Sequence, residues 1–127
     1  MMKHFIDIND FSSNELNELI KLALDFKHKK IVNFKPLNNK NVGLLFEKPS
    51  LRTRVSFEVG IKRLGGHVIT LKHDEVGLGE RESIQDVASV LSRYLDMIMI
   101  RTFNHDTLKT YTNFSKCSVI NGLSDFS

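Results

Sequence analysis

Short apolar runs alternate with helix-like segments along the whole chain, and this alternation most limits what the chain can fold into. The runs lie at 42–46, 67–71, 97–100 and 117–120, and they are largely apolar at successive positions. Strands of this kind bury both faces, which is typical of a parallel sheet covered by helices. The pattern predicts an α/β fold, a three-layer domain with a parallel four-stranded sheet flanked by helices.

Helix signals separate the predicted strands. Ser12 and Glu15 have the spacing of a capping box, and the apolar positions that follow have helical periodicity: Leu16, Leu19, Ile20, Ala23 and Leu24. Further helices are predicted at 51–64, from a cap at Ser83 with an apolar face that runs on to Tyr94 and Leu95, and at 105–113.

Two arginines lie in the first turn of the predicted helix 51–64. This is the positive end of the helix dipole, where each cation costs a few tenths to about 1 kcal/mol. Arg54 has Glu58 one turn further on, whereas Arg52 has no partner at helical spacing. A bound anion, with phosphate the best fit, would explain Arg52. The alternative is that Arg52 pairs with Glu47 or with a more distant carboxylate.

Polar residues follow two of the predicted strands directly. Ser50, a predicted cap for the amide of Thr53, comes shortly after the strand 42–46, and Arg101 follows the strand 97–100. Because ligands of open parallel sheets bind beyond the carboxyl ends of the strands, both groups are expected at one edge. This expectation assumes that the two strands are neighbours.

Composition limits the class of protein. The chain has 127 residues, enough for one domain, and its net charge of +3 comes from interspersed acids and bases, so we expect no nucleic-acid partner. No apolar run is long enough to cross a bilayer, so we expect no membrane partner. The first residues lack a signal-peptide core and Cys117 is the single cysteine, which favours a cytoplasmic location.

The other chemically active side chains indicate no second site. The five histidines lack paired ligand spacing, so we expect no metal and place all five at the surface or at strand edges. Cys117 is expected to fill the core. No glycine-rich nucleotide motif is present, so we expect no cofactor.

The segment 46–58, FEKPSLRTRVSFE, resembles the carbamoyl-phosphate loop of the aspartate and ornithine carbamoyltransferases. Its Glu-Lys-Pro leans towards the ornithine branch. The segment 100–103 resembles the second arginine segment of the family, and 121–125 resembles the stretch before its next binding motif. The resemblance covers essentially the whole chain.

The resemblance implies transfer of a carbamoyl group from carbamoyl phosphate to L-ornithine, giving L-citrulline and phosphate, without metal or cofactor. It implies that Ser50, Leu51 through its amide, Arg52 and Thr53 hold the phosphate. Arg101 would bridge the phosphate and the carbonyl oxygen. Arg101, Arg52 and Thr53 are thus the candidate catalytic residues, while Arg54 is expected to brace the loop through Glu58.

In the family, a second domain holds the amino-acid substrate, and the full enzymes are trimers. Residues 1–127 are therefore expected to form the carbamoyl-phosphate-binding domain alone, without the ornithine-binding domain, and to be inactive in isolation. The charged segment 72–82, expected to be a surface loop, corresponds to a loop that reaches a neighbouring subunit's site. Gly77 stands where ornithine enzymes place a glutamine, and Arg81 could supply the contact by charge. We expect a homo-oligomer.

Two alternatives remain open. An aspartate or putrescine carbamoyltransferase would share the phosphate loop, because the missing domain selects the amine. A non-enzymatic anion-binding or regulatory module would bind carbamoyl phosphate and plain phosphate equally well.

Overall fold

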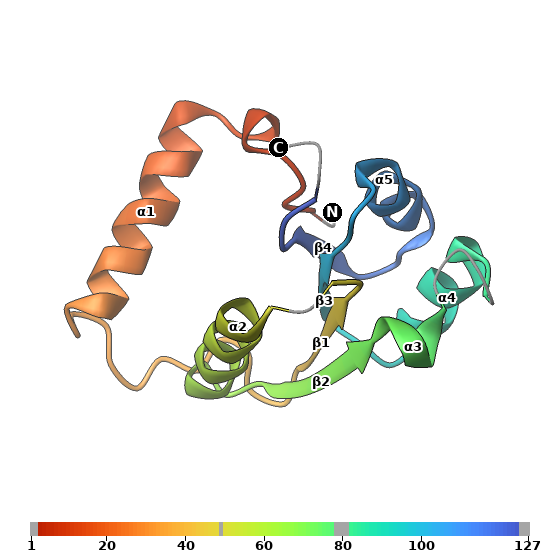
Figure 1. Ribbon diagram of the computed structural model, residues 1–127. Coiled ribbons are helices and arrows are strands. Elements are labelled where there is room, and N and C mark those ends of the chain that lie inside the picture. The colour runs from red at the N-terminus through yellow and green to blue at the C-terminus, as the bar shows by residue number, and fades with distance from the viewer. Residues whose placement is uncertain (1–2, 49, 78–81, 125–127) are drawn as a thin grey trace.

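The computed structural model describes residues 3–48, 50–77 and 82–124 (Figure 1). Short apolar runs form the strands and capped amphipathic segments form the helices. The elements in chain order are η1 (Ile8–Asp10), α1 (Ser13–Lys27), β1 (Asn41–Phe46), α2 (Leu51–Arg63), β2 (His67–Lys72), α3 (His73–Val76), α4 (Ile84–Leu91), β3 (Met97–Arg101), α5 (His105–Phe114) and β4 (Ser118–Asn121).

The four strands form one parallel sheet in the order β2-β1-β3-β4, which confirms the predicted class. After β1 the chain forms β2 on one side and then crosses to form β3 on the other side. β1 and β3 are therefore neighbours, paired from Val42 with Met97 to Phe46 with Arg101, as the site prediction assumed. Their carboxyl ends flank the point where the winding reverses, the usual ligand position in such sheets.

Alternate side chains of β1 serve two cores, one on each face of the sheet. Leu44 and Phe46 pack in a cluster with Ile61 of α2, whereas Leu45 packs in a second cluster with Ala88 of α4 and with residues of α5. Figure 1 shows α2 on one side of the sheet and α4 and α5 on the other. The predicted three layers are thus present, and β1 is fixed from both faces.

Three local predictions were wrong. The segment 72–82 is not a loop throughout, because Lys72 ends β2 and the next four residues form the short helix α3, whose Val76 packs against the core cluster that includes Ala88 of α4. α4 ends at Leu91, so Tyr94 lies beyond the helix and is 69% exposed. His105 is buried rather than at the surface, and its ring bonds the buried Ser124, three residues beyond the end of β4.

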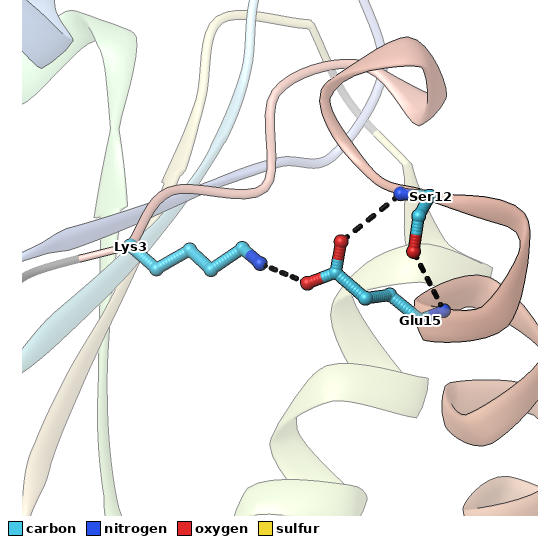
Figure 2. Close-up of polar contacts among 3 residues, drawn as sticks. All are labelled: Lys3, Ser12 and Glu15. Atoms are coloured by element: carbon cyan, nitrogen blue, oxygen red, sulfur yellow. Dashed lines mark hydrogen bonds and ion pairs between the residues drawn. The ribbon is translucent and has the colours of Figure 1, made fainter.

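α1 lies apart from the sheet in Figure 1, and none of its residues is buried. Its predicted capping box is present (Figure 2): Ser12 N–H donates to Glu15 Oε1 at 3.0 Å, and Glu15 N–H donates to Ser12 Oγ at 3.1 Å. Lys3 Nζ lies 2.5 Å from the other Glu15 oxygen. The start of α1 is therefore held by polar contacts, while its apolar positions stay half exposed. Within the described ranges, no helix has the length and apolarity to cross a membrane.

Candidate functional site

α2 begins at the sheet edge, and the described residues offer no acceptor to several of its first backbone amides. Ser50 occupies the N-cap position, but its side chain makes no capping hydrogen bond, so the predicted cap to Thr53 is wrong. The amides of Leu51, Arg52 and Thr53 have no acceptor among the described residues. The backbone of Ser50, with φ of −157° and ψ of 101°, differs from that of the serines that cap α1 and α4, where φ is −73° and −67° and ψ is 161° and 148°. Unpaired donors at a helix start attract anions.

The other helix starts differ from that of α2. A side chain caps η1, α1, α4 and α5, and each of these has an acidic residue in its first turn. α2 has no acidic residue there and carries Arg52 and Arg54 instead. The first turn of α2 thus keeps its positive dipole end uncompensated by local anions.

Arg101, the last residue of β3, reaches the start of α2. Its Nη1 donates to Thr53 Oγ1 at 2.9 Å, which brings two of the predicted site residues into contact. Its Nε is buried and has no hydrogen-bond partner in the described part of the chain. A buried, unpaired donor on a cation costs free energy unless a ligand accepts from it. Arg101 therefore offers an unused donor beside the uncapped helix.

The alternative partner of Arg52 is not formed. Glu47 accepts a hydrogen bond from the amide of Phe103 at 2.6 Å, and it makes no ion pair with Arg52. Arg52 is exposed, and no carboxylate pairs with it among residues 3–48, 50–77 and 82–124. Arg54, in contrast, pairs with Glu58 at 2.9 Å, as predicted. Within these ranges, Arg52 is thus a cation in the first turn of α2 without a carboxylate partner.

A cleft of about 500 Å³ lies beside the start of α2, on the side of β2. It is lined by Phe46, Glu47, Ser50, Leu51, Arg54, Thr70, Lys72 and Asp74. The cleft shares Ser50 and Leu51 with the predicted site, but Arg52, Thr53 and Arg101 do not line it. The candidate site is therefore identified by the unpaired hydrogen-bond donors at the start of α2 and on Arg101, and not by the position of the cleft.

The predicted inter-subunit residues lie away from this contact in sequence. Gly77 follows α3 and is buried, with φ of +61°, a backbone conformation that favours glycine. Its carbonyl accepts a hydrogen bond from the amide of Glu82 at 3.1 Å. Arg81 lies outside the described residues. A contact from either residue to another subunit stays a prediction.

Two polar contacts at the same sheet edge were not predicted from the sequence. One is the bond between Glu47 and Phe103; the signal for it was an acidic residue directly after β1. The other joins His105 Nδ1 and Ser124 Oγ at 2.7 Å, with both residues buried. In the part of the chain that the structure describes, no group of three His, Cys, Asp or Glu side chains could hold a metal ion.

Comparison with known families matches residues 3–127 to the model for "Aspartate/ornithine carbamoyltransferase, carbamoyl-P binding domain". Curated relatives named ornithine carbamoyltransferase include that of Methylococcus capsulatus, 47% identical over 123 residues, and that of Anoxybacillus flavithermus, 44% identical over 125. Each alignment covers 97% of this chain and 41% or 40% of the relative. The chain therefore spans about two fifths of the length of these relatives.

Solved structures agree with the sequence comparison. The anabolic ornithine carbamoyltransferase of Campylobacter jejuni has a TM-score of 0.91 at 37% identity, covering 97% of this chain and 40% of that one. The enzyme of Thermus thermophilus has a TM-score of 0.89 at 40% identity, covering 98% and 43%. An N-acetyl-L-ornithine transcarbamylase is also similar, with a TM-score of 0.87 at 33% identity, covering 97% and 43%.

Proposed function

The chain belongs to the aspartate/ornithine carbamoyltransferase family, and from this premise we propose that its sheet edge binds carbamoyl phosphate for transfer of the carbamoyl group to L-ornithine. The observation that carries the proposal concerns Arg101: its buried Nε finds no hydrogen-bond partner in the described part of the chain, while its Nη1 bonds Thr53 at the uncapped start of α2. A dianionic phosphate would supply the missing acceptors.

In this proposal the phosphate lies on the first turn of α2. The free amide of Leu51 and the hydroxyls of Ser50 and Thr53 donate to it, and Arg52 and Arg101 neutralise its charge. Hydrogen bonds between ionised partners are about twice as strong as those between neutral groups. The absence of a local carboxylate in the first turn of α2 supports an anionic ligand over a cationic one.

The proposed reaction is direct attack of the neutral δ-amine of ornithine on the carbamoyl carbon. A C–N bond forms, the bond from the carbamoyl carbon to the bridging oxygen breaks, and phosphate leaves with that electron pair and takes up the proton that the amine loses. Negative charge develops on the carbonyl oxygen in the tetrahedral intermediate. In this proposal Arg101 and Thr53, which are in contact with each other, stabilise that charge, and loss of one such donor in other enzymes costs about 2.7–4 kcal/mol.

The identity of the amine acceptor is proposed from the relatives and not from the site. A structure titled N-acetyl-L-ornithine transcarbamylase shares this fold, so the fold is compatible with more than one acceptor. Aspartate and putrescine therefore remain alternatives. We propose that a separate ornithine-binding domain selects the amine, that residues 1–127 bind carbamoyl phosphate without transferring it, and that the complete enzyme is a cytoplasmic trimer.

Titration calorimetry with carbamoyl phosphate and with inorganic phosphate tests the proposal. The chain should prefer carbamoyl phosphate, and Arg101→Ala should weaken its binding roughly 10- to 150-fold, the range for one hydrogen bond to a charged group. Arg93→Ala is the matched control, because Arg93 is exposed and precedes β3 at the opposite edge of the sheet.

Equal affinity for the two anions would favour a non-enzymatic anion-binding module instead. If Arg101→Ala and Arg93→Ala weaken binding of carbamoyl phosphate equally, the loss reflects only the reduced net positive charge, and Arg101 does not contact the ligand. Formation of citrulline by the 127 residues alone would contradict the proposed need for a second domain.

A further inference from the structure

Glu47, the first residue after β1, bonds the exit of β3 at two points. Its backbone N–H donates to the carbonyl of Arg101 at 2.8 Å, and its carboxylate Oε1 accepts from the amide of Phe103 at 2.6 Å. These bonds lie on either side of Thr102, whose side chain is buried. One residue thus fixes the backbone both before and after the point where β3 ends.

The carboxylate replaces an acceptor that the sheet no longer supplies. The pairing of β1 with β3 ends at Phe46 and Arg101, so Phe103 lies beyond the last strand partner. A carboxylate on a backbone amide is a charge-assisted bond, stronger than the amide-to-carbonyl bonds of the ladder. Lys48 adds a second contact to the same segment, with Nζ 5.1 Å from the centre of the Phe103 ring.

These contacts hold the backbone that carries the Arg101 side chain. The backbone carbonyl of Arg101 accepts a hydrogen bond from the amide of Glu47, and its guanidinium donates to Thr53. The hydrogen bonds of Glu47 therefore constrain the backbone from which the Arg101 side chain extends. Displacement of a binding group by about 1 Å can cost as much as 100-fold in rate. The position of the backbone at residues 101–103 therefore matters for any ligand held by Arg101.

We propose that Glu47 is a positioning residue, which holds the exit of β3 through the Phe103 amide and so keeps Arg101 in place beside Thr53. Glu47 acts through the backbone and not by contact with the ligand. The expected effect of Glu47 on carbamoyl-phosphate binding rests on the proposed function, whereas its expected effect on the position of Arg101 does not.

The test compares Glu47→Ala, which removes the acceptor, with Glu47→Gln, which keeps a carbonyl oxygen at the same distance from the backbone. Asp96→Ala is the matched control. Asp96 Oδ2 accepts from the amide of Asn41 at 2.8 Å, so the control loses the same charge and a bond of the same kind between β1 and β3, at the opposite edge.

Hydrogen exchange by NMR on the 127-residue chain reports the Phe103 amide and the buried Arg101 Nε–H without any ligand. Glu47→Ala should speed exchange of both signals, Glu47→Gln should largely restore them, and Asp96→Ala should leave them unchanged. The inference is overturned if the Phe103 amide is unprotected in the unmodified chain, or if Glu47→Ala alters neither signal.

Calorimetry with carbamoyl phosphate then measures the consequence. Glu47→Ala should bind roughly tenfold more weakly, the low end for disturbing one charge-assisted hydrogen bond, and Glu47→Gln should bind nearly as the unmodified chain does. An equal loss in Asp96→Ala would overturn the positioning role. Failure of the unmodified chain to prefer carbamoyl phosphate over phosphate would reject the proposed function, while the exchange of the Arg101 signal would still decide the role of Glu47.

Discussion

Two buried side-chain atoms have no hydrogen-bond partner among the described residues, Arg101 Nε and the hydroxyl of Tyr111. The same deficit has different meanings in different surroundings. Arg101 lies at the sheet edge beside free amides, where a ligand can supply an acceptor. Tyr111 is fully buried in the core with Leu108 and Cys117, where no ligand has access. Only the first indicates function.

Replacing Tyr111 by Phe should leave stability unchanged or raise it by up to about 1 kcal/mol, because the buried hydroxyl is desolvated without compensation. Burial, with a smaller effect from Cys117, raises the pKa of Tyr111. The unfolded chain therefore loses this proton first, and stability falls as the pH rises above 10, an effect that Tyr111→Phe removes. Urea unfolding at pH 7 and pH 10.5 measures both. A loss of more than 1 kcal/mol at pH 7 would contradict the prediction.

Among the elements, the helices differ in whether side chains accept hydrogen bonds from the backbone amides of the first turn. At α1 the Ser12 cap and the Glu15 carboxylate satisfy the donors within the chain, as Figure 2 shows. At α2 the serine at the same position leaves them unsatisfied. The sequence signal of a serine before a helix was the same in both, and only backbone geometry distinguished a cap from a candidate ligand site.

The start of α1 should respond to acid. The hydrogen bond from Lys3, followed by those with Ser12, lowers the pKa of Glu15 from 4.5 to about 2. A lowered carboxyl pKa stabilises the folded state above pH 4.5, and that stabilisation is lost as the pH falls from 4.5 through about 2. The protection of the Ser12 and Glu15 amides against exchange, relative to their intrinsic rates at each pH, should therefore fall over this range.

Glu15→Gln is the control for this acid response, because it keeps an acceptor for Ser12 and cannot titrate. The variant should show no change specific to this pH range. If the unmodified chain and the variant respond to acid alike, the Lys3–Glu15 contact does not stabilise α1 in solution.

At the scale of the whole molecule, apolar side chains remain on two helix faces. Val55 and Val59, one turn apart on α2, are 43% and 42% exposed, and apolar residues of α1 are exposed to a similar extent: Leu19, Ile20, Leu22 and Leu24. Burial of such surface is the main driving force of association. The isolated chain is therefore expected to self-associate.

Sedimentation velocity at increasing concentration measures this association. The double variant Val55→Asn, Val59→Asn should shift the distribution towards the monomer, because it removes apolar area from α2 without touching the sheet. Tyr94→Asn is the control, since Tyr94 is also exposed but follows α4. A monomeric unmodified chain would contradict the expectation of a homo-oligomer.

Much of the fold followed from local sequence. The apolar run at 42–46 and the segment 51–64 became β1 and α2 within one residue at each end, because strand and helix periodicity are local properties. The parallel sheet followed from their alternation. Tyr94 and His105 were misplaced, since their environments depend on where α4 ends and on how α5 packs.

What the sequence by itself determined was the four strands, the helices α1, α2, α4 and α5, the parallel sheet and the two groups of candidate site residues that follow β1 and β3. The strand order that makes β1 and β3 neighbours, the uncapped start of α2, the contact of Arg101 with Thr53 and the bond from Phe103 to Glu47 were decided only by the tertiary structure. The physical reason is distance along the chain. Contacts between residues about 50 positions apart depend on how the sheet winds and on single backbone angles, which no local pattern encodes.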